Sequence, residues 1–389
     1  MSYNFDRIID RRQTNSIKID KMPLIFGRDD LQPLWVADMD FATPGFILND
    51  LKERLNHPVL GYTLRKSGFY QAFINWADKR YGWNLKENWL DFSPGVVGAL
   101  AVSILALTKE NDKIIIQPPV YHPFFDVVKG NNRQLIENPL VRNDKGDYQM
   151  DFKHLRSLID TQTKMIIIAN PHNPVGRVWT KQELETLGKI AVENDLIIVS
   201  DDIHADFIYT GNTYTPLASI DETIARQTVT VMAPSKTFNI AGLSTSVVII
   251  PNENLKNKYR QKLMDMHLFL GNIFGNIAFE SAYNKGENWL KELLVYLENN
   301  RNYIVDFLQK NIPDIKPVIP EGTFLMWLDF SATGLTHQQI KEKLINQAKL
   351  ALNDGLSFGK NGEKYFRFNF ATPLENIKKA LEKLKVFES

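Results

Sequence analysis

Five short apolar segments lie between residues 113 and 250, and polar residues do not interrupt them regularly. They are rich in β-branched residues, a pattern typical of central strands that are covered on both faces. Helical patterns lie between them, the clearest over 180–194, which opens with the capping-box spacing Thr180-Lys-Gln-Glu183. This alternation predicts an α/β fold: a mostly parallel central sheet with helices on both faces. The predicted strands are residues 113–117, 164–169, 196–200, 228–232 and 246–250.

The pattern changes towards both ends of the chain. Residues 1–47 contain few periodic apolar positions, and we expect an extended N-terminal arm that packs on other elements and forms part of the small domain. After residue 286, a long helical stretch precedes a segment in which Phe366, Phe368 and Phe370 alternate with polar residues, so one strand face is expected in the core and the other is expected to be polar. We therefore predict an arm at 1–47, a large ligand-binding domain at 48–285 and a smaller α+β lobe at 286–389.

The amino-acid composition and net charge exclude several classes of protein. The 389 residues are 44% hydrophobic and carry a formal net charge of +1, so charge gives no case for a nucleic-acid or anionic membrane partner. No apolar run approaches the roughly 18 to 20 residues of a membrane-spanning helix. The chain has no cysteine, which excludes disulfides and a thiolate nucleophile and agrees with a cytoplasmic location. Its seven histidines lack metal-binding spacing, so we expect no metal site.

Four polar side chains follow predicted strands: Tyr121, Asn173, Asp201 and Lys236. Ligands of parallel α/β sheets collect at the carboxyl ends of the strands, which makes these side chains candidates for one site. A desolvated lysine loses its proton readily, and the neutral amine condenses with aldehydes. Taken alone, however, most lysines are solvated surface charges, and an aspartate at a strand end is often a helix cap.

The order of several motifs carries a resemblance to a known family. Asn170-Pro-His-Asn-Pro-Val-Gly176, then Asp201, then Ser235-Lys-Thr-Phe238 and finally Arg367 resemble the fold-type I pyridoxal-phosphate enzymes of the class I/II aminotransferase superfamily. Further stretches resemble the branch of MalY/PatB-type cystathionine β-lyases, or C-S lyases. These stretches are residues 35–41, 93–97, 117–124 and 369–373.

The resemblance implies pyridoxal 5'-phosphate as the cofactor. Lys236 then supplies the amine that holds it, Asp201 pairs with the ring nitrogen, Asn173 donates to the phenolic oxygen and Tyr121 stacks on the ring. Lys236, Asp201 and Tyr121 form the predicted catalytic set. His204 either helps to orient the polar edge of the ring or is an ordinary core histidine, and both interpretations stay open.

Phosphate and substrate contacts are also implied by the resemblance. Val96 and Val97 begin a helix whose free amides suit a phosphate, with Ser235 beside them. Tyr62 is expected to reach the phosphate and substrate of a neighbouring subunit, in a homodimer with shared active sites, although alone it is an ordinary aromatic. Arg367, with Asn173, is expected to bind the amino-acid carboxylate. Asp38 either lines the substrate pocket or turns the chain.

The sequence departs from the wider superfamily near the predicted phosphate site. Many members have a serine three residues before the lysine and a basic residue eight after it, where this chain has Ala233 and Ser244. The phosphate then depends on amides, hydroxyls and Tyr62. A smaller departure is Asp202, where the branch usually has glutamate.

The branch resemblance predicts β-elimination at the C–S bond of cystathionine, cysteine or cysteine S-conjugates, which gives pyruvate, ammonia and a thiol. The first alternative is an aminotransferase acting on amino acids. The second is a regulatory protein that keeps the fold without catalysis, because a fold alone does not fix a function.

Overall fold

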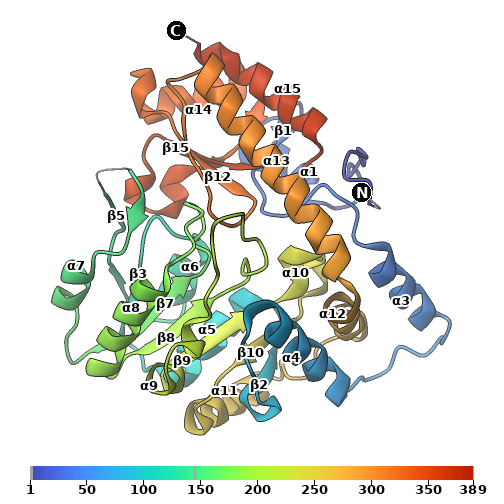
Figure 1. The fold of residues 1–389 in the computed structure, drawn as a ribbon, viewed down its shortest axis with the longest axis vertical. Helices are drawn as coiled ribbons and strands as arrows, with labels where there is room; N and C mark the ends of the chain where they lie inside the picture. The colour runs from blue at the N-terminus through green and yellow to red at the C-terminus, as the bar shows by residue number, and fades with distance from the viewer. Residues whose placement is uncertain (1–2, 144–145, 389) are drawn as a thin grey trace.

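A seven-stranded sheet forms the centre of the larger of two lobes (Figure 1). The computed structural model describes residues 3–143 and 146–388. Strand β10 runs antiparallel to both of its neighbours, while the pairs β9–β8, β8–β7, β7–β3 and β3–β4 are parallel, which confirms the predicted mostly parallel sheet. In spatial order the strands are β2 (Leu90–Ser93), β10 (Ser246–Ile249), β9 (Thr228–Met232), β8 (Ile197–Asp201), β7 (Thr163–Ala169), β3 (Lys113–Ile116) and β4 (Gln134–Glu137).

Both faces of this sheet are buried. Ile115 and Ile166 belong to one core cluster, with Leu187 of helix α8, whereas their chain neighbours Ile114 and Ile167 belong to another, with residues of helix α5. Successive strand side chains point to opposite faces, so strands buried on both faces need uninterrupted apolar sequence. The helices of this lobe are α3 (Gly45–Leu55), α4 (Ser67–Tyr81), α5 (Val96–Leu107), α6 (Pro123–Lys129), α7 (Phe152–Ser157), α8 (Lys181–Glu193), α9 (Glu222–Arg226), α10 (Pro234–Thr237), α11 (Glu253–Asp265) and α12 (Ile273–Lys285).

The smaller lobe follows α12 and contains a four-stranded antiparallel sheet in the order β11-β12-β15-β14. The long helix α13 (Glu287–Asn311) leads into it from the larger lobe (Figure 1). The predicted boundary at residue 286 lies between α12 and α13. The other helices and strands of the smaller lobe are β11 (Lys316–Val318), β12 (Leu325–Asp329), α14 (His337–Asn346), β13 (Leu350–Ala351), β14 (Asn353–Asp354), β15 (Tyr365–Asn369) and α15 (Leu374–Leu384). A separate hairpin joins β5 (Val141–Arg142) to β6 (Tyr148–Gln149).

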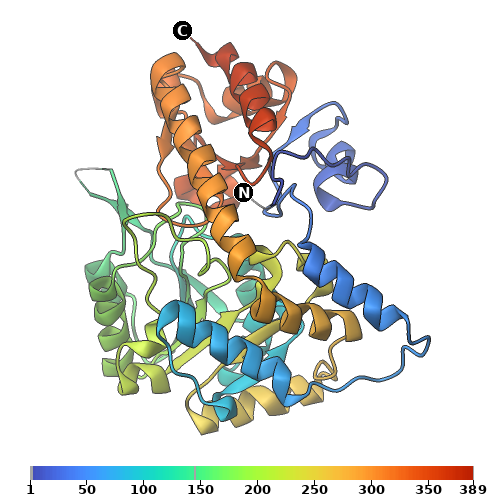
Figure 2. The same ribbon diagram turned by 45° about the vertical axis from the view of Figure 1, so that its right-hand side comes forward.

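The N-terminal segment lies beside the smaller lobe (Figure 2), where β1 (Gln32–Pro33) pairs in parallel with β13. The prediction of an extended arm is wrong in part, because the arm contains the short helices α1 (Ile17–Asp20) and α2 (Met22–Phe26). The Asp20 carboxylate accepts hydrogen bonds from the backbone N–H groups of Gln13 and Ser16, which stabilises the turn before α1. No helix in the described part of the chain is long and apolar enough to cross a membrane.

The alternating segment at the end of the chain forms β15, but its polar face is not solvated. Arg367 and Asn369 are 2% and 0% exposed, as buried as Phe366 and Phe368 on the other face. The reason is that residues 35–41 pack across this face: the Asn369 amide donates to the Val36 carbonyl at 2.6 Å and to the Asp38 carbonyl at 2.7 Å. Polar side chains can therefore alternate along β15 although they are buried, because backbone carbonyls replace water as their hydrogen-bond partners.

Asn239 of the larger lobe binds the same segment at other backbone groups. Its side-chain oxygen accepts from the Met39 N–H at 3.1 Å, and its amide donates to the carbonyls of Met39 and Phe41 at 3.0 and 2.8 Å. Its own backbone is left-handed, with φ of 55°. Asparagine tolerates this conformation better than other residues with a β-carbon.

Replacing Asn239 by alanine should therefore destabilise the protein strongly. Three hydrogen bonds disappear, each contributing about 1 kcal/mol, so we expect a loss of roughly 3 kcal/mol in addition to the backbone effect. Thermal unfolding at fixed protein concentration measures it. Asn132→Ala is the control, because Asn132 has a similar φ of 59° at an exposed position. Equal melting temperatures for the two variants would contradict the anchoring role of Asn239.

Candidate active site

A cavity of about 260 Å³ lies at the carboxyl ends of β7, β8 and β9. Its walls come from the larger lobe, except that Ala37 of the N-terminal segment closes one side. This is the position at which parallel α/β sheets bind ligands. The cavity brings together most of the residues predicted for the site: Val96, Val97, Tyr121, Asn173, Asp201, His204, Ser235 and Lys236.

Lys236 lies on the one-turn helix α10, directly after β9. Its amine donates a hydrogen bond to the Ala37 carbonyl at 2.6 Å. Burial lowers the pKa of Lys236 to about 8, and the nearby Asp38 carboxylate opposes that shift. An amine with a pKa near 8 is neutral in an appreciable fraction of molecules at neutral pH, which is the form that reacts with a carbonyl carbon.

Asp201 ends strand β8 and is 4% exposed. Burial raises the pKa of Asp201 to about 7, and the hydrogen bond from the Ile203 N–H at 3.2 Å opposes the shift. Because burial disfavours the ionised form of this carboxylate, a cationic group that enters the cavity would stabilise it strongly. His204 lies in the same cavity with a buried Nδ1 that has no partner among the described residues, and burial holds its pKa well below the usual range.

Helix α5 presents its N-terminus to the cavity. Gly95 precedes it with φ of 90°, a conformation that a residue with a β-carbon rarely adopts. The first N–H groups of a helix have no partner within the helix, and its dipole favours an anion there. The amides of Val96, Val97 and Gly98 therefore suit a phosphate group, and Ser235 and Ser244 line the same cavity.

Arg367 approaches this region from β15 of the smaller lobe. Its guanidinium donates to Asn173 Oδ1 at 3.0 Å and to the Trp35 carbonyl at 2.8 Å, and lies 4.9 Å from the centre of the Phe358 ring. Burial lowers the pKa of Arg367 to about 10, so it stays charged at neutral pH. Among the described residues, no carboxylate lies within 4.0 Å of this guanidinium, and its Nε has no hydrogen-bond partner. A buried cation without a counter-ion favours an anionic ligand.

Asp38 and Tyr62 do not line the cavity. The carboxylate of Asp38 pairs with Arg11 at 2.6 Å and with Lys18 at 3.6 Å, and its contribution to a substrate pocket stays a prediction. Sequence patterns gave no sign of this cluster, because its cations lie 20 and 27 residues before Asp38. Tyr62 is 97% exposed on the connection between α3 and α4, away from the cavity of its own chain.

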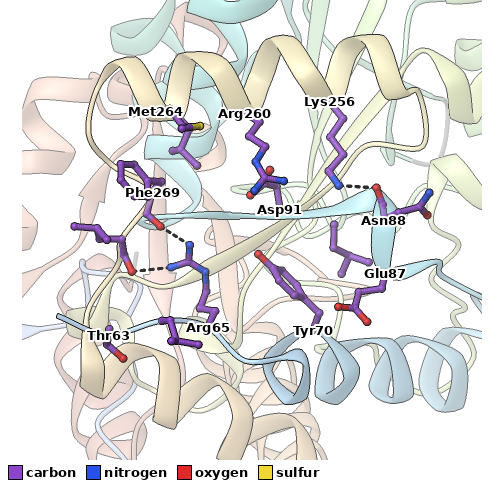
Figure 3. Close-up of a pocket in the computed structure, with 14 residues that line it drawn as sticks. Thr63, Arg65, Tyr70, Glu87, Asn88, Asp91, Lys256, Arg260, Met264 and Phe269 are labelled. Carbon is purple, nitrogen blue, oxygen red and sulfur yellow. Dashed lines mark hydrogen bonds between the residues drawn. The ribbon is translucent and has the colours of Figure 1, made fainter.

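A second, larger pocket of about 810 Å³ lies between α4, β2 and α11 (Figure 3). Arg65 enters it from the α3–α4 connection and donates to the carbonyls of Phe269 and Leu270, with its guanidinium 4.0 Å from the centre of the Phe92 ring. None of the predicted site residues lines this pocket. Its walls lack the combination of a buried amine, a buried carboxylate and a helix N-terminus that the smaller cavity has.

Backbone carbonyls are the site groups that sequence reasoning missed. The carbonyls of Trp35 and Ala37 bind Arg367 and Lys236, respectively. Every residue has a carbonyl, so no residue type signals this role. The only available signal was the position of both within the 35–41 stretch that resembles the C-S lyase branch.

Comparisons with known proteins agree with this geometry. The cystathionine β-lyase PatB of Bacillus subtilis is 40% identical over 98% of this chain and 99% of that protein. The crystal structure of cystalysin from Treponema denticola, which contains a pyridoxal 5'-phosphate cofactor, is 36% identical with a TM-score of 0.96, over 100% of this chain and 99% of that one. The PLP-bound C-S lyase of Staphylococcus hominis is 38% identical with a TM-score of 0.91, over 99% and 98% of the two chains.

A profile of one family, aminotransferase class I and II, matches residues 51–384. The match spans both lobes and includes every residue that lines the cavity except Ala37. These findings confirm the resemblance seen in the sequence motifs. The chain belongs to the aminotransferase class I and II family.

Proposed function

We propose that this protein is a pyridoxal-phosphate-dependent C-S lyase. Its reaction is the β-elimination of cystathionine, cysteine or cysteine S-conjugates to pyruvate, ammonia and a thiol. The observation that carries the proposal is the combination, near one small cavity, of the Lys236 amine, the Asp201 carboxylate and the Arg367 guanidinium, which has no counter-ion among the described residues. Similarity to proteins named as cystathionine β-lyase and C-S lyase supports the choice of elimination.

The donor set of the cavity fits pyridoxal phosphate. The cofactor needs an amine, an anion for its ring nitrogen, a phosphate site and a surface for its ring. Lys236 provides the first and Asp201 the second, while the N-terminus of α5 provides amides for the phosphate. Asn173 and Tyr121 lie in the same wall, where an amide and an aromatic face suit the phenolic oxygen and the ring.

Each residue then has a chemical role. When bound, pyridoxal phosphate accepts the electron pair that remains on the substrate α-carbon after its proton is lost. Lys236 would hold the cofactor, and its Nζ atom, when free, would take the proton of the substrate α-carbon. Asp201 keeps the ring nitrogen protonated. Arg367 orients the substrate carboxylate, while His204 donates or accepts at the polar edge of the ring. The C–S bond breaks and the thiolate leaves with its electron pair, and one water hydrolyses the remaining three-carbon imine to pyruvate and ammonia.

A product assay tests the reaction. Purified protein with cystathionine should release pyruvate and thiol in equal amounts. An aminotransferase, which is the alternative function, needs a keto acid as co-substrate and releases neither pyruvate nor thiol from cystathionine. Borohydride should fix the cofactor covalently to Lys236, identifiable by peptide mass. Lys236→Ala should lose this adduct and at least a thousandfold in turnover, because the base is absent. Amino transfer without thiol release would overturn the lyase proposal.

Arg367 should act mainly on substrate binding. Arg367→Ala removes a bidentate, charge-assisted contact of roughly 1.5 to 3 kcal/mol, so KM should rise about 10- to 100-fold with a smaller change in kcat. Arg367→Lys keeps the charge without the planar fork and should give an intermediate KM. A substrate analogue without the α-carboxylate is the control, and its binding should change little in either variant. An unchanged KM for the amino acid would exclude this role.

The homodimer belongs to the same proposal, and it places Tyr62 in the active site of the partner subunit. Tyr62 lies among exposed apolar side chains, with Val59, Leu60 and Leu64 at 63%, 53% and 72% exposure. Figure 2 shows that this α3–α4 connection extends away from the body of its own chain. An exposed apolar segment of this kind is typical of a protein–protein contact. A cytoplasmic location is also proposed, supported by the absence of cysteine.

Mixed dimers should test the shared site. Lys236→Ala subunits and Tyr62→Ala subunits are each expected to be inactive or impaired. In a mixed dimer, one of the two sites receives both native residues, so activity should return to that site. Two different affinity tags isolate the mixed dimers before the assay. Verified mixed dimers that regain no activity would show that Tyr62 does not act across the interface.

A further inference from the structure

Asp206 is a buried carboxylate that accepts three side-chain hydrogen bonds and makes one ion pair. It is 4% exposed and lies five residues after Asp201, on the loop that follows β8. Its Oδ1 accepts from Trp76 Nε1 at 3.1 Å and from the Tyr81 hydroxyl at 2.6 Å, and pairs with Arg80 at 2.8 Å. All three of these side chains come from helix α4.

The third hydrogen-bond donor comes from the helix that carries Lys236. Thr237 is 0% exposed, and its hydroxyl donates to Asp206 Oδ2 at 2.7 Å. Helix α10 has only four residues, and isolated helices of this length are unstable without tertiary contacts. Its position therefore depends on side chains at Lys236 and Thr237 and on the packing of Phe238, whose ring lies 5.9 Å from that of Trp76.

The hydrogen bond between Thr237 and Asp206 thus joins the segment that carries the Lys236 amine to the segment that follows the Asp201 carboxylate. The loop of Asp206 follows directly on Asp201, the last residue of β8, and Thr237, which donates the bond, is next to Lys236 in the sequence. A displacement of α10 would change the separation between the Lys236 amine and the Asp201 carboxylate. A buried charge-assisted bond to Oδ2 resists such a displacement, because Trp76 and Tyr81 of α4 hold the same carboxylate through Oδ1.

We propose that Asp206, acting through Thr237, is a positioning residue that fixes the Lys236 amine relative to Asp201. The inference rests on the proposed function of Lys236. Neither Asp206 nor Thr237 lines the cavity, so their effect is indirect. Their loss should slow the proton transfer at Lys236 while leaving the Arg367 region, and with it substrate binding, in place.

Thr237→Val deletes the hydroxyl and keeps the shape of the side chain. We expect kcat for thiol release to fall on the order of 10- to 100-fold, because small misplacements of a reacting group have effects of this size, with KM within about twofold of the wild-type value. Thr237→Ser keeps the hydroxyl and should restore most of the activity. Thr228→Val is the control, since Thr228 is also 0% exposed and its hydroxyl also donates once, to the Ile224 carbonyl at 2.7 Å. It should lower stability without lowering kcat.

A second measurement does not require the loaded enzyme. In the apoprotein, the rate at which an amine reagent labels Lys236 reports its pKa when followed against pH by peptide mass. Burial has the largest effect on the pKa of this amine. The charges of Asp38, Asp201 and Arg367 also affect this pKa, and they are present in the wild-type protein and in the Thr237 variants alike. Release of α10 towards water should move the labelling midpoint in Thr237→Val upwards by about one pH unit, and Thr237→Ser should not show this shift.

The outcomes separate the two proposals. A wild-type protein that releases no thiol would overturn the proposed reaction, while the labelling curve still reports on the position of Lys236. Thr237→Val with the wild-type kcat and the wild-type labelling midpoint would overturn the positioning role. An equal fall in kcat in Thr237→Val and Thr228→Val would also overturn the positioning role, because the fall would then follow from general destabilisation.

Discussion

The backbone of residues 35–41 is held from both lobes at once, and the geometry of the site depends on this double attachment. Lys236 and Asn239 bind its carbonyls from the larger lobe, and Arg367 and Asn369 bind them from the smaller lobe. The amine and the guanidinium that the proposed reaction uses are therefore spaced by one shared segment. A buried carbonyl needs a donor, so each of these contacts also satisfies the segment itself.

Charge pairing behind the segment reinforces this arrangement. Asp38 and Asp40 pair with Arg11 and with the fully buried Lys18, so two carboxylates meet two cations. Removing any one of the four would leave one unbalanced charge in this poorly solvated cluster, which costs more than a single pair contributes. The N-terminal arm thus supports the site from outside the cavity. Its role is to hold the segment that Lys236 contacts.

The parts of this molecule that could be predicted from sequence are those that depend on residue type. Uninterrupted apolar strands predicted the central sheet, because a strand buried on both faces tolerates few polar residues. Lys236, Asp201 and Asn173 follow such strands and meet in one cavity. The ion pairs of Asp38 and the burial of Arg367 could not be predicted in this way. They depend on where a distant segment packs, and the polar pattern of β15 is the same whether it faces water or carbonyl groups.

The lone charge of Arg367 also affects the protein before any substrate arrives. A buried cation without a counter-ion remains incompletely solvated, and small anions that reach it lower its free energy. The resting protein is in this sense an anion receptor. Where Arg367 binds the substrate carboxylate, as proposed, chloride, phosphate or sulfate in the medium competes with the amino acid for the same guanidinium. The apparent affinity for substrate then depends on which anions are present as well as on the total ionic strength.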